Sequence, residues 1–297
     1  MTTPQPGIFA QGTRSQYHLE FDLLPNVDPP EVAVALSSLR EPLVTAGGTN
    51  IVVGVRGSLW QRIAPDDAPA NLHDFAGVDG DGRSVPSTPH DLWVWLHGTG
   101  PDVLLDNARS VVAALAPAAK LAHEEPCFVY LDSRDLTGFI DGTENPPVED
   151  GPEVAIVPDG QPGAGGSHVI TMKWVHDLAA FHELALEDQE AVIGRTKLDS
   201  QERDDKPDTA HISRVVVEDD QGEELEIYRR SAPYGRITEL GLYFVAFSAD
   251  PTRFEIMLNR MFGVTDGIHD RLTDFTKPVS GAFYFAPSLD ALKKLGT

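Results

Sequence analysis

Three side chains in the second half of the sequence could do chemistry if the fold brought them together. Asp141 stands in RDLTGFIDGTENP, where Asp-Gly is first of all a turn signal. His211 opens the apolar run ISRVVV, an expected strand that could aim it beyond a sheet, although a structural histidine is the more common case. Arg229 shares one face of a second expected strand, IYRRSAPYG, with Ser231. Because an inward arginine needs an anion nearby, these groups would form a polar pocket in an apolar wall.

The remaining histidines and the cysteine give no sign of a further metal site. The sequence has ten histidines and one cysteine, with no HxH or HExxH pair. These features argue against a multi-histidine zinc or copper site and against an internal disulfide. Cys127, in the apolar run PCFVYL, is expected to be a buried structural residue. His18 is expected on the polar face of a half-buried strand.

The composition is that of a globular chain with a large excess of acid. Its 297 residues are 41% hydrophobic and 23% charged, and 46 Asp and Glu against 23 Lys and Arg give a net charge of −23. Nucleic acids and anionic membranes would be repelled, whereas a neutral or cationic small substrate would not. Solubility and adaptation to salt both explain the acidity. No apolar stretch approaches the roughly 18 residues of a membrane span. The first residues show no export signal, so a cytoplasmic location is expected.

Hydrophobic periodicity divides the chain into two halves with a similar order of elements. In the first half it predicts strands at 16–24, 51–57, 91–98 and 127–132, and helices at 30–46 and 101–119. In the second half it predicts strands at 168–175, 211–218, 224–230, 241–248 and 281–288, and helices at 177–192 and 251–263. The turn residues at 219–222 join two of these strands as a hairpin.

This order predicts an α+β fold of tandem ferredoxin-like units, β-α-β-β-α-β twice, with antiparallel sheets covered by helices. The expected domains are residues 1–133 and 134–297. A long connection at 133–166, rich in Gly, Pro and acids, contains Asp141. Since loops of this length are often functional, the second unit is expected to carry the site.

Several separate motifs resemble one family. GFIDG, within GFIDGTENP, is similar to the GxxDG signature of dye-decolourising peroxidases. Further stretches agree with that family in order and spacing: PQPGIFAQGTRSQYHLEFDL, VIGRTK, KPDTAHISR, YRRSAPYG, GLYF and FTKPVSGAFYFAPSLD. The resemblance covers nearly the whole chain, and the short chain without a leader looks most like the cytoplasmic B-type branch. It implies a dimeric α+β barrel type of fold.

The resemblance implies a role for each candidate residue. His211 is similar to the proximal ligand of one haem b per chain, Asp141 to the distal aspartate and Arg229 to the distal arginine. Ser231 stands where many B-type members have Asn, a departure that a subgroup of the branch shares and that bears on the polarity of the peroxide pocket. A guanidinium such as that of Arg195, in GRTK, suits a haem propionate.

The resemblance also implies the chemistry around the iron. A carboxylate that accepts the second N–H of a ligating imidazole makes the ligand more donating, and Glu202 and Asp274 are the candidates for this position. On the other side, a carboxylate can move the proton of peroxide, and Arg229 can stabilise the charge that develops. Arg229 is expected to keep Asp141 ionised.

The expected activity is therefore reduction of hydrogen peroxide with oxidation of dyes, phenols or other one-electron donors, by a homo-oligomer without an evident encapsulation tail. Large donors would need electron transfer through Trp or Tyr, for which Trp60, Trp93, Trp95 and Trp174 are available, although such residues more often form core. Two alternatives stay open. One is a protein that removes iron from haem or stores and delivers haem, which would release free porphyrin if it removed iron. The other is a non-haem ferredoxin-like module, which would show no Soret band.

Overall fold

The computed structural model describes residues 2–39, 48–80, 82–219 and 221–295. One antiparallel sheet of ten strands runs through both halves of the chain, in the order β6-β1-β5-β2-β12-β7-β10-β8, with β11 on β7 and β9 on β10. The bounds in the first half are β1 Ser15–Leu23, β2 Thr49–Arg56, β5 Leu92–Gly98 and β6 Ala119–Phe128. Those in the second half are β7 Ser167–His176, β8 Tyr228–Arg229, β9 Ala232–Gly235, β10 Leu240–Ser248, β11 Thr276–Pro278 and β12 Ala282–Ala286. The α+β class with a large antiparallel sheet is confirmed.

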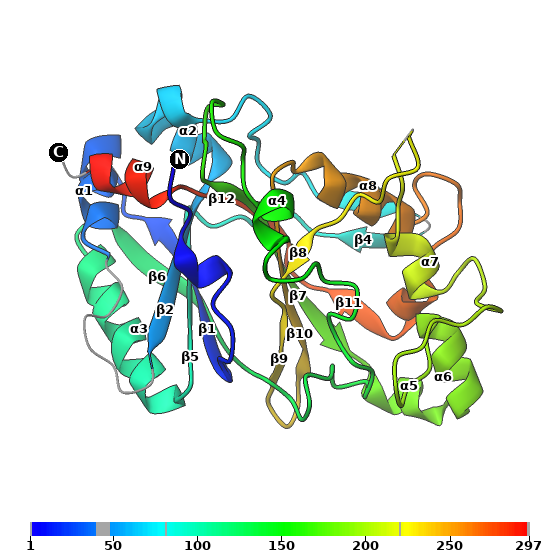
Figure 1. The fold of residues 1–297 in the computed structure, drawn as a ribbon. Coiled ribbons are helices and arrows are strands. Elements are labelled where there is room, and N and C mark those ends of the chain that lie inside the picture. The colour runs from blue at the N-terminus through cyan, green and yellow to red at the C-terminus, as the bar shows by residue number, and fades with distance from the viewer. Residues whose placement is uncertain (1, 40–47, 81, 220, 296–297) are drawn as a thin grey trace.

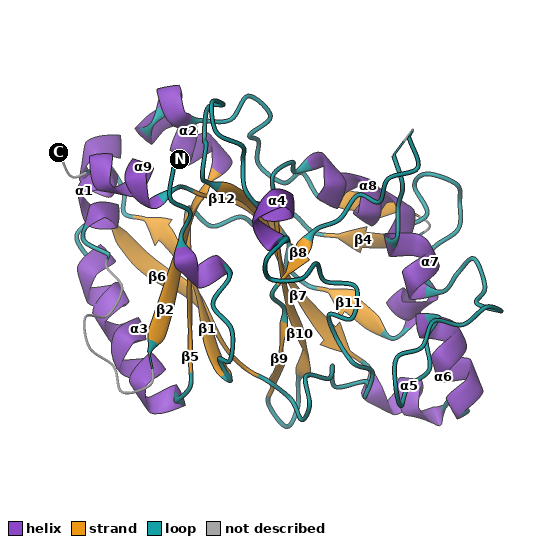
Figure 2. Cartoon of the chain, viewed as in Figure 1, coloured by secondary structure: helices purple, strands orange, loops and turns teal. Residues whose placement is uncertain are grey.

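Helices cover the outer sides of the strands at both flanks of the molecule (Figures 1 and 2). The N-terminal flank carries α1 Pro29–Ser37, α3 Pro101–Leu115 and α9 Leu289–Lys294, with α2 Gly57–Ile63 beside them. The C-terminal flank carries α5 Leu178–Glu183, α6 Leu186–Ile193, α7 His211–Val215 and α8 Thr252–Met261. The short α4, Gly151–Ala155, lies between the flanks, and a small hairpin of β3 Val78–Gly80 and β4 Arg83–Val85 lies near α8.

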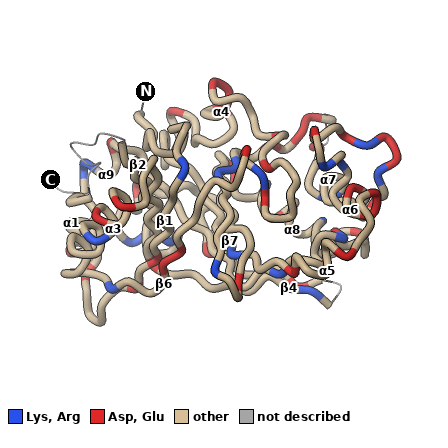
Figure 3. The backbone as a smooth tube through the Cα atoms, turned by 90° about the horizontal axis from the view of Figure 1, so that it is seen from below, with Lys and Arg blue, Asp and Glu red and all other residues tan. Residues whose placement is uncertain are grey.

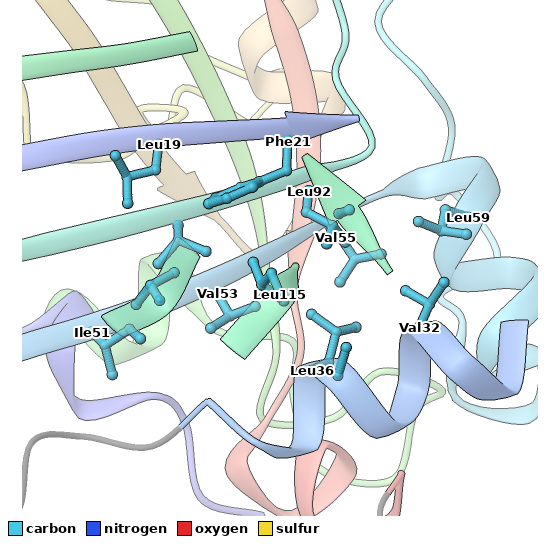
Figure 4. Packing of buried hydrophobic residues seen from close by; sticks show 14 of the residues in the cluster. Leu19, Phe21, Val32, Leu36, Ile51, Val53, Val55, Leu59, Leu92 and Leu115 are labelled. Carbon is cyan, nitrogen blue, oxygen red and sulfur yellow. The ribbon is translucent and has the colours of Figure 1, made fainter. Parts of the chain in front are cut away.

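Packing on the N-terminal flank follows the helical period of α3. Leu104, Ala108, Val111 and Leu115 recur at helical spacing and are buried against β1 and β5. α1 begins at a capping box, in which Glu31 accepts the backbone N–H of Asp28 at 2.9 Å. Figure 4 shows the resulting cluster of leucine, valine, isoleucine and phenylalanine side chains between these helices and the sheet.

The opposite face of the sheet is buried as well, because the sheet curves until β6 contacts β9. β1 therefore buries its apolar side chains, such as Leu19, under the helices and its polar ones, Gln16, His18 and Glu20, in the interior. The expectation of an outward polar face for His18 is wrong, because the curved sheet leaves that face no solvent. Cys127 is buried there, as predicted.

Several predicted elements differ from the structure. The segment expected as a strand at 211–218 begins instead with the helix α7, and 224–230 forms only the short β8. Contacts override the β-propensity of the ISRVVV run: Arg214 of α7 bonds both Asp266 and the carbonyl oxygen of Arg260.

Other differences concern the ends of elements. β6 occupies 119–128, where the end of a helix and a later strand were predicted, and alternate side chains of this segment are at least partly buried. The helix predicted at 177–192 is two helices, broken at the extended Leu184. α1 ends at Ser37, and the predicted helical residues 40–46 lie outside the described part. Further elements were not predicted: α2, α4, α9, β9, β11 and the β3–β4 hairpin.

Acidic residues are distributed over the whole described chain. Asp and Glu are spread along both halves and lie thickly around α6 and α7 (Figure 3). Among the described residues, no helix is both long and apolar enough to cross a bilayer.

Candidate active site

A cavity opens between the C-terminal sheet and its covering helices. Its wall on the sheet side consists of alternate residues of β7 and β10, among them Met172 and Phe244. The opposite wall comes from α7 and α8, with Met257 and Leu258. Apolar side chains dominate both walls. Polar side chains line the rest of the cavity, and these include the predicted residues His211, Asp141, Arg229 and Arg195.

His211 enters the cavity from the first turn of α7. Its Nδ1 lies 2.6 Å from Oδ2 of Asp270, a fully buried residue just before the 3-10 helix Arg271–Asp274. The second oxygen, Oδ1, accepts the backbone N–H of Leu272 at 2.8 Å, which fixes the carboxylate. Since a carboxylate accepts this bond, Nδ1 carries a hydrogen, and in the neutral imidazole Nε2 is the nitrogen with the lone pair.

The two acids predicted to orient His211 lie elsewhere. Glu202 accepts from Lys206 at 2.6 Å, and Asp274 accepts from Arg83. The prediction that either one contacts His211 is therefore wrong, and Asp270 takes that position. The sequence HDRLTD offers two aspartates four residues apart, and only the path of the chain at the end of α8 decides which one reaches the imidazole.

Arg229 and Asp141 are brought together at the cavity by a residue that the sequence analysis missed. Asn145 accepts the backbone N–H of Arg229 at 2.7 Å and donates to its carbonyl oxygen at 3.1 Å. The loop that carries Asp141 is thereby paired to the end of β8 as an extra strand would be. The only sequence signal was the position of Asn145 within the GTENP motif.

Asp141 has an electrostatic environment that was not foreseen. Burial raises the pKa of Asp141, and the nearby charge of Arg229 lowers it without restoring the ordinary value. The charge of Asp135 also contributes to the raised pKa. The predicted influence of Arg229 on Asp141 is present, but desolvation has the larger effect on the pKa of this carboxyl.

A second imidazole–carboxylate pair anchors the loop that leads to Asp141. His176, on β7, places Nε2 at 3.1 Å from Oδ2 of Asp135, and Oδ1 of Asp135 accepts the backbone N–H of Thr137 at 2.8 Å. Burial would raise the pKa of Asp135, but the hydrogen bonds from His176 and Thr137 bring it below its usual value. Sequence patterns gave no indication of this pair.

Ser231 is not one of the residues that line the cavity. Its Oγ accepts the backbone N–H of Val245 at 3.2 Å and lies 3.5 Å from the carbonyl oxygen of the same residue. The predicted shared face with Arg229 assumed an unbroken strand, whereas β8 ends at Arg229 and β9 begins at Ala232. The hydroxyl bridges this break in the ladder.

Arg195 lies at an acidic edge of the cavity. It contacts Glu144 and donates to the carbonyl oxygen of Ser200 at 2.7 Å. Among the described groups its buried Nε has no hydrogen-bond partner. Glu224 and Glu226 line the cavity too, and burial together with the charge of Glu226 raises the pKa of Glu224.

This set of groups fits a haem better than a bare metal ion. No cluster of three or more His, Cys, Asp or Glu in the described chain could hold an ion. A single imidazole with a free Nε2, backed by a carboxylate and facing an apolar cavity, suits an iron that already carries porphyrin ligands. The orphaned Nε of Arg195 suits an anionic substituent at the edge.

Comparison with known families agrees with this geometry. The C-terminal model of the Dyp-type peroxidases matches residues 132–291, and the N-terminal model matches residues 44–128. The chain belongs to this family. It is 39% identical over 271 residues to the dye-decolorizing peroxidase of Rhodococcus erythropolis. The aligned part covers 88% of this chain and 80% of that protein. The protein of the same name from Mycobacterium tuberculosis is 37% identical over 252 residues, or 82% of this chain and 74% of that one.

Solved structures of the family superpose over almost the whole chain. A dyp-type peroxidase protein from Shewanella oneidensis matches with a TM-score of 0.93, 36% identity and 99% coverage of both chains. DypB from Rhodococcus jostii RHA1 matches with a TM-score of 0.90, 35% identity and 99% coverage of both. Variants of that DypB are described in complex with heme. The chain is thus a haem peroxidase of the dye-decolorizing type.

Proposed function

We propose that the cavity binds one haem b per chain, with Nε2 of His211 as the proximal iron ligand and hydrogen peroxide as the oxidant. The observation that carries this proposal is the bond between His211 and Asp270, which leaves Nε2 free towards an apolar cavity. When bound, the haem supplies an iron centre that peroxide can oxidise by two electrons and that one-electron donors can reduce again.

Asp270 sets the properties of the ligand. By accepting the Nδ1 hydrogen it fixes the tautomer and the ring orientation of His211, and its negative charge increases electron donation from Nε2. Because Asp270 is fully buried, water does not compete for this bond. We assign Asp270 this orienting role in place of Glu202 and Asp274.

Arg229 and Asp141 serve the peroxide side. The carboxylate of Asp141 takes the proton from the attacking peroxide oxygen and returns it to the leaving oxygen. Its raised pKa increases its affinity for that proton. The guanidinium of Arg229 stabilises the negative charge that develops on the leaving oxygen, and Asn145 holds its backbone in place.

Arg195 is proposed to bind a haem propionate. Arg195 contacts Glu144 in the structure, so a bound propionate would replace the carboxylate of Glu144 with its own. We infer the B-type subgroup with a distal serine from Ser231. Because its hydroxyl bonds the backbone of Val245, we expect Ser231 to support the strand that presents Arg229.

The assembly and location remain sequence-based proposals. Two ferredoxin-like domains, residues 1–133 and 134–297, would form a homo-oligomer of the dimeric α+β barrel type, which would sediment well above a 32.2 kDa monomer at micromolar concentration. The cytoplasmic location can be tested by cell fractionation.

The experiment that tests the function is reconstitution. The purified chain is mixed with haem, and the Soret band, the haem content per chain and peroxide-dependent oxidation of a dye are measured. We expect one haem per chain and dye oxidation that requires peroxide. Absence of a Soret band would contradict haem binding, and release of free porphyrin under reducing conditions would favour iron removal.

A further inference from the structure

A polar and aromatic cluster lies on the other side of the sheet from the cavity. This interior cluster is made of fully buried or nearly fully buried residues of β1, β5, β10 and β12: His18, Glu20, Trp93, Trp95, Tyr243 and Tyr284. The proposed peroxide chemistry uses none of them, and a carboxyl group inside a core needs an explanation.

Glu20 is shared by two phenols. The hydroxyls of Tyr243 and Tyr284 both donate to its Oε1, each at 3.3 Å. Burial raises the pKa of Glu20, although the two hydrogen bonds act against it. Its carboxylate therefore holds a proton more tightly than an exposed glutamate, and it is already placed on the hydroxyl of each ring.

The cluster is stacked, but its tryptophans are poor sites for an oxidised state. His18 stacks on Tyr243 with ring centroids 4.1 Å apart and on Trp93 at 5.9 Å. The Nε1 of Trp93 has no hydrogen-bond partner among the described groups, so nothing accepts its proton. The guanidinium of Arg230 lies 5.1 Å from the ring of Trp95, and its charge opposes a positive charge there. The Nε1 of Trp95 donates to Oε1 of Gln16 at 2.9 Å, a neutral amide that is a far weaker base than a carboxylate. Within the described cluster, the rings that donate to a carboxylate are those of Tyr243 and Tyr284.

Tyr243 lies on β10, a strand that lines the proposed haem cavity with its other face. On β10 its neighbours Leu242 and Phe244 line the cavity, while Tyr243 points to the interior cluster. The side chains of adjacent strand residues emerge on opposite faces. The electron-transfer path from the phenol to the cavity therefore crosses the backbone of a single strand.

We propose that Tyr243, with Glu20 as its proton acceptor, is an internal one-electron donor to the peroxide-oxidised haem. The step is balanced: the phenol loses one electron to the haem, its O–H bond breaks, and the proton goes to Oε1 of Glu20. The products are a neutral tyrosyl radical, a protonated Glu20 and a haem reduced by one electron. Tyr284 shares the acceptor and is the second ring of the same site. The proposal rests on haem binding as proposed above.

The test is electron paramagnetic resonance of the haem-loaded chain, frozen shortly after addition of one equivalent of hydrogen peroxide without a donor. We expect an organic radical signal, and its hyperfine splitting should collapse when the protein is grown with ring-deuterated tyrosine. Tyr243→Phe should abolish most of the signal. Glu20→Gln removes the base and keeps the shape, so it should slow radical formation by about 10²-fold, the lower end for loss of a positioned base.

Tyr17→Phe is the matched control, because Tyr17 lies on β1 like Glu20 but on its outer face, packed against the helix-covered cluster. It should keep the wild-type signal. An unchanged signal in Tyr243→Phe, or a wild-type signal that ring deuteration does not alter, would overturn the proposal. Optical spectra of the same samples distinguish failure of this proposal from failure of the proposed function. If peroxide leaves the haem band unchanged, the proposed function fails as well. Deuteration needs no substitution, so the test stands even if a variant does not fold.

Discussion

Both flanks of the molecule pack helices on the same sheet, but the cavity described above lies in the C-terminal flank. On the N-terminal flank, α1 and α3 press leucine and valine side chains directly onto β1, β2 and β5 (Figure 4). On the C-terminal flank, the apolar residues of α8 face those of β7 and β10 around open space. Polar side chains also reach the cavity, since His211, Arg229 and Asp141 line it. The comparison shows that helices packed on one sheet can enclose either an apolar cluster or a cavity that polar side chains enter.

The largest effect is expected from removing the side chain that would bind iron. His211→Ala leaves the cavity without a ligand, so the purified variant should lose most of its haem while the fold is kept. Haem content per chain, measured after identical expression and purification, checks this. His90→Ala, on the N-terminal half, is the control and should retain haem. Wild-type spectra and haem content in His211→Ala would remove this residue from the role.

The next effect concerns the peroxide side of the cavity. Arg229→Leu should slow oxidation of the haem by peroxide by about 10²–10³-fold, because it removes a charge-stabilising donor. Asp141→Ala removes a proton carrier worth nominally about 10²–10⁴-fold, but water can replace it in part, so its cost should be smaller. Ser231→Ala should cost least, since the hydroxyl bonds backbone. Stopped-flow mixing ranks the three, and a wild-type rate in haem-loaded Arg229→Leu would refute the electrostatic role.

A smaller effect separates the two aspartates behind the histidine. Asp270→Asn should weaken haem binding by about 10–100-fold, the usual cost of losing a partner of a metal ligand. Asp274→Asn is the matched control, because Asp274 bonds Arg83 and not His211. Titration of each haem-free variant with haem gives the affinities. Equal affinities in the two variants would show that the bond between His211 and Asp270 does not tune the ligand.

Two truncations, one in each flank, test whether the two flanks differ in packing. Leu104→Ala, in the N-terminal cluster, should lower the free energy of unfolding by about 2–5 kcal/mol without changing the peroxide rate per folded molecule. Met257→Ala should cost less in the haem-free chain because its side chain lines the cavity and packs on fewer neighbours there. Denaturant unfolding of both variants decides. An equal loss would mean that the cavity closes when haem is absent.

The smallest effect is a dependence of stability on pH. Folding raises the pKa of Asp141, mainly through burial. Such a carboxyl favours the folded state while it is protonated, and this contribution is lost as pH rises from about 3.9, the unfolded value, through the folded value. Haem-free Asp141→Asn should therefore gain stability relative to wild type as pH increases over this range. If the difference in free energy of unfolding between Asp141→Asn and wild type is the same at all pH values, the raised pKa is contradicted.

The sequence predicted the elements whose burial is simple. β7 and β10 are continuous apolar runs, and α3 and α8 have helical periods, so all four were identified. At β1 the period predicted the strand but not the burial of its polar face, and at α7 it predicted a strand where contacts with α8 stabilise a helix. The three main site residues line one cavity as motif resemblance implied. Asp270, Asn145 and the break at Ser231 could not be predicted, because each depends on how distant segments meet.

The last strand of the chain has a consequence for synthesis and folding. β12 pairs with β2 on one side and with β7 on the other. As the chain leaves the ribosome, the edge of β2 must wait for residues 282–286 before this pairing can form. Such distant pairing slows folding, and an open strand edge is a template for aggregation. A nascent chain that has not yet added β12 thus exposes the edge of β2 that β12 covers in the folded protein.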